Sequence, residues 1–511
     1  MNKSADIAIL GGGLAGMTLA LQIKKSLPQL NVVVFEQRDK PAPERAFKVG
    51  ESMVEVSSWY LGEVLGLKNY LLTNHLPKLG LRFFMNNGEN IDFGSRPEYG
   101  LLNIPTAPKD LNHALPGVHF ITYNIDRGKF ENDLKQFCID EGVEIIQGIK
   151  VKSISIGKPH RAILKSNSSE WELQANWVID TTGRSGLLSR QLNLRIPQEH
   201  RVNATWFRVD GCINPDNFTE DKSFHNRTFS NIRWLSTNHL MGKGYWIWLI
   251  PLFGGATSVG IMTDPSQHSF KNTNTFEKAM KWLEDHEPSL AQAITNFSLY
   301  DIKVMKSEAY LCKQVLSNKR WSIIGESAFF SDALYSPGGD FIAIGNTLTT
   351  EMIKADNSGD NYRFSLMVKF GDQLMKGMYN HYSGLYKGSY QLMGRPGTML
   401  LKVAWDTAVY FAYNVLLFRN GFFCDPHFHS QIRIENARLN DLQLYMLDFL
   451  KNHKDTNSYT GKYIDQSLIE PIQSLYHSSK NSLNVDELKI CLKNNIDILE
   501  KFAQNIENIL P

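Results

Sequence analysis

The feature that most constrains this chain is a glycine-rich turn near its N-terminus. Residues 6–10 form a short apolar run that leads into GGGLAG at residues 11–16, which has the spacing G-x-G-x-x-G and opens an apolar helix. In this pattern Gly11 permits a tight turn, Gly13 lets the backbone approach a pyrophosphate, and Gly16 lets helix and strand pack closely. The helix N-terminus adds N–H donors and a dipole that favours phosphate.

A second apolar strand, residues 32–36, ends in Glu36, which lies 20 residues after Gly16. That is about the distance at which a carboxylate binds the ribose of a dinucleotide. Strand, turn, helix, strand and acid together predict a dinucleotide-binding unit. Its candidate ligands are Gly11, Gly13, Leu14, Ala15, Gly16 and Glu36.

Composition excludes several classes of protein. The chain has 511 residues, enough for two or three domains, and 54 basic against 52 acidic residues, so nothing suggests a nucleic-acid partner. Its five cysteines are scattered and fit neither a disulfide framework nor a zinc ribbon. The N-terminus does not resemble a secretory signal, and we therefore expect a cytoplasmic protein. Cys424, His427 and His429 have metal-ligand chemistry at a spacing that matches no zinc site, so we expect no metal.

The periodicity becomes helical after about residue 355. Asn484 and Glu487 form a capping box that predicts a helix through Phe502. Residues 399–418 are apolar and about long enough to span a bilayer, but they contain Lys402 and Asp406, which are costly at membrane depth. A buried or interfacial helix is therefore favoured over a membrane-associated one.

Three further segments indicate FAD rather than NAD. Asp126 and Arg127 open a helix and resemble the D-R-x-x-F/L segment of flavin aromatic hydroxylases, while residues 178–184 resemble the turn that closes their dinucleotide domain. Residues 321–328 resemble their late strand–Gly–Asp segment, whose acid holds the ribityl chain; here Glu326 stands where Asp is usual. No second G-x-G-x-x-G follows, so we expect a separate NAD(P)H-dependent flavin reductase or transient docking of NAD(P)H.

The W-x-W-x-I-P sequence of residues 246–251 is the signature of flavin-dependent halogenases, which this chain resembles. The resemblance implies that Trp246 and Trp248 wall off the flavin from the organic substrate. A flavin that cannot touch the substrate can oxidise halide instead of hydroxylating carbon. We expect residues 258–262 to form the returning strand of a hairpin.

Residues 76–84 resemble the K-x-G-x-x-F segment of family members that act on phenols and pyrroles. The resemblance implies that Lys78 is catalytic, through a hydrogen bond to hypohalous acid or through a haloamine if burial lowers its pKa. Strand alternation predicts that Lys78, Gly80 and Arg82 share one polar face.

Two loops resemble the family's flavin-facing segments. Residues 47–52 match its V-G-E-A/S loop, which implies flavin contacts from Gly50, Glu51 and Ser52. Residues 330–341 match the loop and helix N-terminus that face the flavin ring, where the amides of Gly338 and Gly339 would hold halide. Tryptophan-specific members carry Glu-Ser where this chain has Tyr335-Ser336, and a tyrosine is a poor base at neutral pH. This difference favours an electron-rich phenol or pyrrole as substrate.

The sequence thus predicts an α/β chain with a Rossmann-type FAD domain, an inserted β-rich substrate region and a helical C-terminal lobe. The expected limits are 1–75, 120–200 and 300–355 for the FAD domain, 76–119 and 201–299 for the substrate region, and 356–511 for the lobe. The expected function is FAD-dependent halogenation of a free or carrier-tethered aromatic molecule, using reduced FAD, oxygen and halide. An FAD monooxygenase that hydroxylates its substrate is the first alternative, and a non-catalytic flavin-binding protein the second.

Overall fold

The computed structural model describes residues 4–43, 48–100, 122–228, 232–453, 463–466 and 469–509. Phe47, at the start of the predicted V-G-E-A/S loop, and much of the predicted substrate region between residues 76 and 119 lie outside these ranges.

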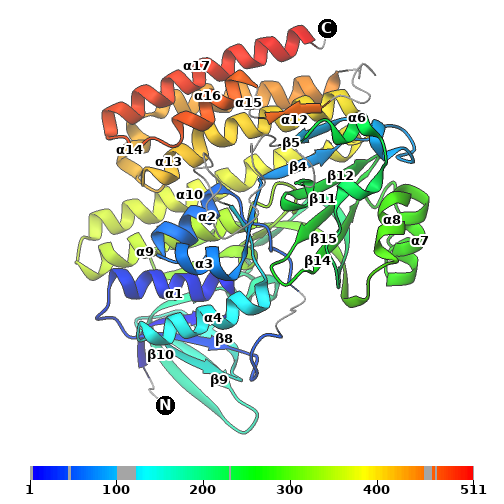
Figure 1. Ribbon diagram of the computed structural model, residues 1–511. Helices are drawn as coiled ribbons and strands as arrows, with labels where there is room; N and C mark the ends of the chain where they lie inside the picture. Colours follow the sequence, from blue (N-terminus) through cyan, green and yellow to red (C-terminus); the bar gives the residue numbers. More distant parts are fainter. Residues whose placement is uncertain are drawn as a thin grey trace.

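The N-terminal strand lies within a parallel sheet, as the glycine pattern predicts. Its register pairs β1 with β2 on one side and with β10 on the other, and β17 and β7 extend the sheet in the same direction. Helices α1 and α4 lie side by side on one face, below α9 in Figure 1. The elements are β1 (Ser4–Leu10), α1 (Leu14–Ser26), β2 (Val32–Glu36), α4 (Arg127–Asp140), β7 (Glu144–Gln147), β10 (Glu170–Asp180), β17 (Trp321–Ile323) and α9 (Gly338–Asn357).

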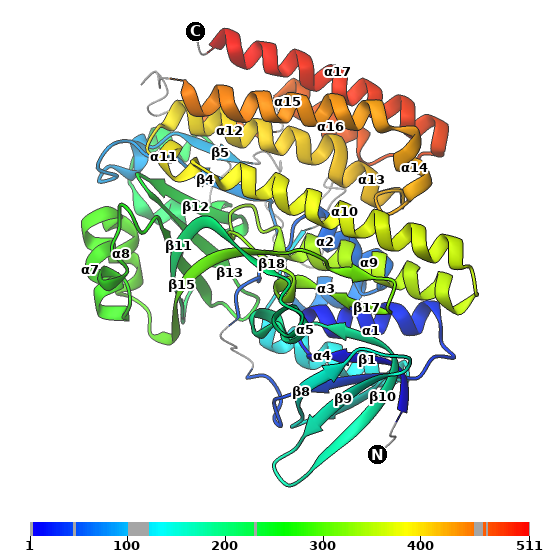
Figure 2. The ribbon, with the colours of Figure 1, turned by 180° about the vertical axis from the view of Figure 1, so that it is seen from behind.

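A second sheet lies beside the first, and Figure 2 shows its long strands β11 and β15 reaching toward the parallel sheet. Its order is β18-β15-β11-β14-β13-β12-β4-β5-β19. The bounds are β4 (Leu81–Phe84), β5 (Glu98–Gly100), β11 (Arg195–Val209), β12 (Thr237–Gly242), β13 (Tyr245–Pro251), β14 (Thr257–Thr263), β15 (Leu299–Cys312), β18 (Phe329–Phe330) and β19 (Tyr463–Asp465). Strands β13 and β14 form the hairpin predicted from the two-tryptophan motif.

The C-terminal helices cover the top of the molecule in Figure 1. They are α10 (Asn361–Tyr386), α12 (Pro396–Val409), α13 (Leu416–Arg419), α15 (Arg433–Asn452), α16 (Glu470–Ser478) and α17 (Val485–Ile509). The capping box is present, because the Asn484 side chain accepts from the Glu487 N–H at 3.1 Å and the Glu487 carboxylate accepts from the Asn484 N–H at 2.9 Å. The helix continues to Ile509 rather than ending at Phe502, since Phe502 and Ile506 both pack into the core.

The apolar segment 399–418 forms α12, a π-helical turn (Tyr410–Val415) and α13, and most of its side chains are buried among the neighbouring helices. Lys402 and Asp406, one turn apart, form a buried ion pair on α12. Among the described residues, no helix is both long enough and apolar enough to cross a membrane.

The predicted polar face of Lys78, Gly80 and Arg82 is wrong. The chain forms two short strands, β3 (Leu76–Lys78) paired with β6 (Thr122–Asn124) and β4 paired with β12, and Gly80 between them has φ +56°. The left-handed turn at Gly80 breaks the alternation. Arg82 consequently forms an ion pair of 2.5 Å with Glu98, in a buried charge network away from Lys78.

Candidate functional site

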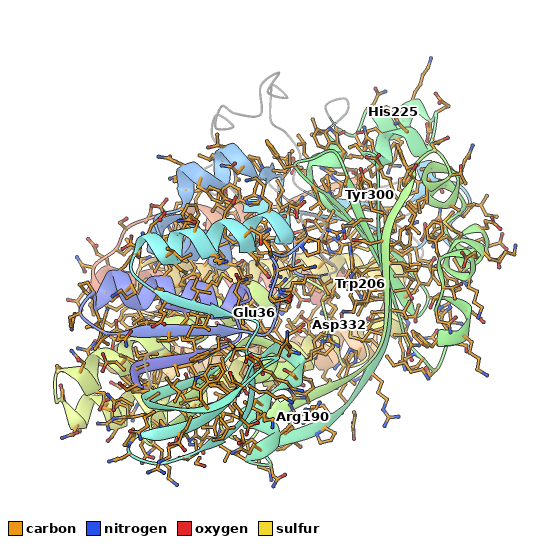
Figure 3. All side chains as sticks on the ribbon, turned by 90° about the horizontal axis from the view of Figure 1, so that it is seen from below. Glu36, Arg190, Trp206, His225, Tyr300 and Asp332 are labelled. Atoms are coloured by element: carbon orange, nitrogen blue, oxygen red, sulfur yellow. The ribbon has the colours of Figure 1, made fainter. Side chains whose placement is uncertain are left out.

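A cavity of about 1010 Å³ lies between the parallel sheet and the second sheet. Glu36, Arg190, Trp206 and Asp332, labelled in Figure 3, all line it although they come from distant parts of the chain. A cavity of this volume can accommodate a dinucleotide-sized cofactor. Its wall contains the sequence-predicted residues Gly11, Gly13, Leu14, Ala15, Glu36, Gly50, Glu51, Ser52, Arg127, Trp246, Trp248, Glu326, Gly338 and Gly339.

The three glycines of the turn have different steric surroundings. Gly11 has φ +114°, and a Cβ there would lie 2.4 Å from the Thr181 carbonyl oxygen. A Cβ on Gly16 would lie 2.0 Å from the Gly11 oxygen, so the close packing at this position requires glycine. Gly16 packs against the turn and is not one of the residues that line the cavity. Around Gly13, the nearest atom to such a Cβ is the Lys48 Nζ at 3.7 Å. The open side of Gly13 therefore faces the cavity, where a pyrophosphate would approach the backbone.

Glu36 is held at the end of β2 by backbone donors. Its Oε2 accepts from the Gly12 N–H at 2.9 Å, and its Oε1 accepts from the Arg38 N–H at 2.9 Å. Oε1 also accepts from the Arg38 guanidinium at 3.1 Å. Oε2 can accept a second hydrogen bond, so Glu36 can still bind a ribose hydroxyl.

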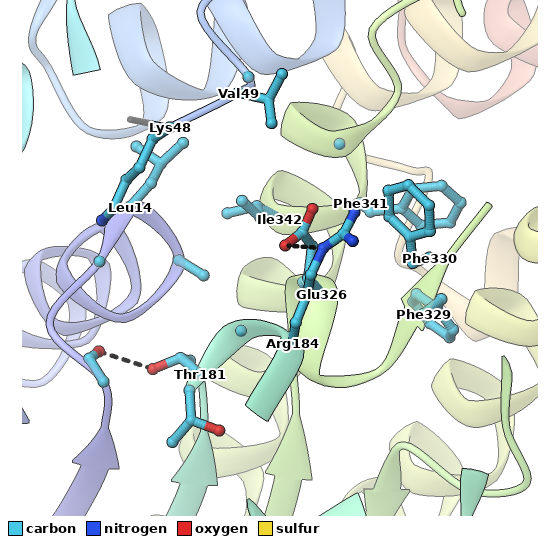
Figure 4. Close-up of a pocket in the computed structure, with 18 of the residues that line it drawn as sticks. Leu14, Lys48, Val49, Thr181, Arg184, Glu326, Phe329, Phe330, Phe341 and Ile342 are labelled. Atoms are coloured by element: carbon cyan, nitrogen blue, oxygen red, sulfur yellow. Dashed lines mark hydrogen bonds and ion pairs between the residues drawn. The ribbon is translucent and has the colours of Figure 1, made fainter. Parts of the chain in front are cut away.

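A charge cluster around the buried Glu131 carboxylate fixes the loop that contains Lys48 and Val49. Arg127 donates to the Val49 carbonyl at 2.8 Å and to Glu131 at 2.6 Å, and Lys48 forms a short ion pair with Glu131. Burial alone would raise the pKa of Glu131, but Arg127 and Lys48 overcome it and hold that pKa at about 2. Figure 4 shows Lys48 lying beside Leu14, at the start of α1. Lys48 is thus a candidate for binding phosphate, which the sequence motifs did not predict.

Thr181 and Glu326 also line the cavity (Figure 4). The Thr181 hydroxyl donates to the Gly11 carbonyl at 2.8 Å and joins the glycine turn to the end of β10. Glu326 accepts from Arg184 at 3.3 Å. This partly exposed carboxylate can accept from a ribityl hydroxyl, the role predicted from the family resemblance.

Trp246 and Trp248 pack on the same face of β13, with ring centroids 5.7 Å apart. The indole N–H of Trp246 donates to the Tyr390 hydroxyl at 3.0 Å, and Tyr390 donates to Asp332 at 2.8 Å. Trp248 fits against Gly260, where any Cβ would lie 2.0 Å from the indole. Both rings are therefore fixed against the cavity by their neighbours.

The loop before α9 is strained where it meets the cavity. Tyr335 and Ser336 have φ of +69° and +56°, a region that side chains disfavour by about 1–3 kcal/mol each. Tyr335 donates to Asp406 at 2.8 Å, which anchors this conformation. A Cβ on Gly338 would meet nothing within 4 Å, whereas one on Gly339 would lie 2.7 Å from Ser57. Space beside the first free amides of α9 is compatible with a bound anion.

Lys78 lies in a second, smaller cavity of about 80 Å³. Its side chain is buried, with 2% of the residue exposed, and it shares the cavity wall with Glu55 from the start of α2 (Glu55–Trp59). Burial lowers the pKa of Lys78 while Glu55 and Asp340 oppose that shift, and burial raises the pKa of Glu55 while Lys78 opposes it. The charge states of this amine and carboxyl therefore depend on each other.

Ser52 and Tyr382 lie between the two cavities. The Lys78 ammonium donates to the Ser52 hydroxyl at 2.6 Å, and Ser52 itself lines the large cavity. Tyr382 lines both cavities, whereas Trp246 and Trp248 line only the large one. The separation on the Lys78 side is thus made by residues other than the two tryptophans, and the spacing of the sequence motifs could not reveal this.

Glu51 gives the protein a pH-dependent stability that can be measured. Burial raises the pKa of Glu51 to about 7. Between about pH 4.5 and 7 the folded protein then binds more protons than the unfolded chain, so this carboxyl lowers the free energy of unfolding as the pH rises through that window.

We expect Glu51→Gln to remove this pH-dependent contribution to the free energy of unfolding. In FAD-free protein, the stability of the parent relative to Glu51→Gln should fall by up to about 3 kcal/mol between pH 4.5 and 8, measured by urea unfolding. The exposed Glu89 provides a control, Glu89→Gln. A constant difference between parent and Glu51→Gln across the range would contradict this expectation.

Asp425, next to the candidate metal ligands of the sequence, and His429, which is one of them, make hydrogen bonds to the backbone. Asp425 caps helix α14 (Pro426–Gln431) by accepting from the His427 N–H at 2.8 Å, and His429 bonds to the Phe423 carbonyl at 2.9 Å. No group of three or more metal-ligating side chains is assembled within the described part of the chain.

Comparison with known proteins finds relatives of this sequence and a solved structure with a similar fold. A family model described as tryptophan halogenase matches residues 102–317. The flavin-dependent halogenase chlA of Dictyostelium discoideum is 26% identical over 437 residues, which cover 80% of this chain and 69% of that protein. A 1H-pyrrole-2-carbonyl-(peptidyl-carrier protein) chlorinase of Pseudomonas fluorescens is 25% identical over 75% of this chain and 80% of that protein. The crystal structure of halogenase PltM has the same fold, with a TM-score of 0.66, 18% identity and 99% coverage of both chains.

Proposed function

We propose that this chain, a relative of the flavin-dependent halogenases along most of its length, is itself an FAD-dependent halogenase of an electron-rich aromatic molecule. The observation that carries the proposal is the position of Lys78. Its amine lies in a cavity of its own and reaches the FAD-sized cavity through a hydrogen bond to Ser52.

The residues of the large cavity fit FAD. Gly13 leaves its backbone open, Lys48 supplies a cation beside it, and Glu36 and Glu326 offer hydroxyl acceptors at two places along the cavity. Bound reduced FAD would supply, with oxygen, the oxidising equivalents that convert halide to an electrophilic halogen. The free amides at Gly338 and Gly339 are suited to hold that halide.

The Lys78 cavity is suited to the transfer of halogen to carbon. A buried lysine with a lowered pKa can either donate a hydrogen bond to hypohalous acid or, when neutral, form an N–halogen bond. As the new carbon–halogen bond forms, the ring must lose a proton. Glu55 in the same cavity, with Lys78 beside it, is placed to accept that proton.

The substrate expected here is a phenol or pyrrole rather than free tryptophan. Burial, followed by the nearby Asp406 carboxylate, raises the pKa of Tyr335 well above 10, so Tyr335 acts as a hydrogen-bond donor and not as a base. A volume of about 80 Å³ is also smaller than the ~150 Å³ cavity that accommodates benzene, so even one ring requires side-chain movement. The pyrrole chlorinase is named for a carrier-bound pyrrole, so carrier-bound pyrroles are candidate substrates alongside free phenols.

The test supplies FAD, NADPH, oxygen and bromide to the purified protein, with and without a flavin reductase, and screens phenols and pyrroles by mass spectrometry. We expect brominated product only when the reductase is present, because no second dinucleotide-binding motif provides a site for NADPH. Rapid reduction of bound flavin by NADPH alone, with hydroxylated product, would instead support the monooxygenase alternative. FAD binding without conversion of any substrate would support the non-catalytic one.

A further inference from the structure

Asp406 lines the Lys78 cavity, and one of its oxygens is buried with no hydrogen-bond donor among the described residues. Asp406 lies near the end of α12, and its Oδ2 accepts from Tyr335 at 2.8 Å and from Lys402 in a short ion pair. Its Oδ1 is buried, and none of the described residues donates to it. Leaving such an acceptor unsatisfied costs about 1–3 kcal/mol, so a native protein normally supplies a donor from a ligand or an ordered water.

Asp406 and Lys78 border the same cavity from different parts of the fold. Asp406 and Lys78 both line the cavity of about 80 Å³, one from a C-terminal helix and the other from β3. The aromatic rings of Phe83, Tyr382 and Tyr410 form part of its wall. A flat ring between these side chains would have Lys78 and Asp406 among its immediate neighbours.

The charges around the cavity select the chemistry of the ligand. Lys402 compensates the charge of Asp406 through Oδ2, so Oδ1 remains as an acceptor that requires an O–H or N–H donor. A ring bearing a carboxylate would bring a second negative charge toward Asp406 and Glu55, which is unfavourable in a buried site.

We propose that Asp406 Oδ1 accepts a hydrogen bond from the phenolic O–H or ring N–H of the substrate and so sets which ring carbon faces Lys78. This proposal rests on the proposed halogenase function and names the group by which the substrate is recognised. Asp406 is a specificity-determining residue, and no proton transfer to it is required.

Asp406→Asn reverses the hydrogen-bonding character of this position with little change in shape. The amide oxygen of the new side chain can still accept from Tyr335 and Lys402, which places its NH₂ group where Oδ1 was. That group cannot accept a hydrogen bond from the O–H of a phenol or the N–H of a pyrrole. Tyr335→Phe is the matched control, because it removes the contact that anchors the strained loop and leaves Oδ1 unchanged.

The probes are 4-bromophenol and pyrrole, each compared with its methylated form, 4-bromoanisole and N-methylpyrrole. Binding to FAD-loaded protein is measured by calorimetry at up to millimolar concentration. We expect the parent to prefer at least one donor-bearing probe over its methylated form by about tenfold or more, and Asp406→Asn to lose that preference. Tyr335→Phe should retain it, since damage to the fold would weaken both members of a pair alike.

An unchanged preference in Asp406→Asn, or no binding of either donor-bearing probe to the parent, would overturn this proposal. Neither result depends on turnover. If bromination succeeds in the assay above while the preference is unchanged, the function stands and only the role of Asp406 fails. If binding depends on Asp406 but no halogenation is found, the recognition stands and the function fails.

Discussion

Replacing Lys78 by alanine is expected to abolish halogenated product while FAD binding is retained. Lys78 lines the small cavity and not the large one, so its loss removes the amine from the substrate side and leaves the wall of the large cavity intact. Loss of a group that acts only in the chemical step commonly lowers the rate by about a hundredfold or more. The measurement is product formation by mass spectrometry alongside the absorbance of bound flavin.

Two further variants distinguish chemistry from packing at this position. Lys78→Met keeps most of the buried volume and should be as inactive as alanine. Lys78→Arg keeps a positive charge but should also fail, because a guanidinium neither loses its proton readily nor fits the place of a compact amine beside Ser52. Lys68→Ala, at an exposed lysine, is the control. Product formation by Lys78→Ala near the parent rate would show that Lys78 only supports the strand.

Replacing Gly13 by valine is expected to reduce the affinity for FAD by at least about a hundredfold, which corresponds to about 2.7 kcal/mol. The backbone at Gly13 has φ −88°, which valine can adopt, and only the flexible end of Lys48 lies near the new side chain. The fold should therefore persist while the valine occupies the space where the pyrophosphate would approach. Affinity is measured by titration of FAD against the fluorescence of the protein, with circular dichroism as the test of folding.

The two other glycines of the turn cannot serve this purpose, since a side chain at Gly11 or Gly16 would collide with backbone atoms and damage the fold itself. A suitable control is Gly377→Val, at an exposed position of α10 with nothing within 4 Å of its Cβ position. If a folded Gly13→Val protein binds FAD as the parent does, the cofactor assignment to this turn is wrong.

Local patterns were sufficient to predict the parts of the protein that are contiguous in the chain. The strand, glycine turn and helix of residues 4–26 follow from a short apolar run and from steric limits at single residues, and Gly11 and Gly16 meet those limits as expected. The β13–β14 hairpin and the capping box at Asn484 and Glu487 have the same local origin. Such features are predictable because the interactions that specify them lie within a few residues of one another.

The alternation of side chains along a strand did not predict the arrangement of residues 76–84, because a single backbone angle decided it. Gly80 in a left-handed conformation separates β3 from β4, which sends Lys78 toward Glu55 and Arg82 toward Glu98. Glycine adopts such angles at little cost, and the pattern of residues 76–84 is equally compatible with one continuous strand. The sequence indicated which lysine to examine but not the neighbours it would have.

By itself the sequence determined the dinucleotide fold, the glycines that FAD would require, and the identity of Lys78 as the residue to test. Only the tertiary structure decided that Lys78 and Asp406, 328 positions apart, border one cavity, and that Ser52 joins this cavity to the larger one. In the sequence Lys402 and Asp406 were only costly charges in an apolar segment, although their spacing of four residues is that of a helical ion pair. The sequence could not reveal that one Asp406 oxygen has no donor among the described residues, because an unsatisfied acceptor is defined by everything packed around it, and those neighbours come from distant parts of the chain.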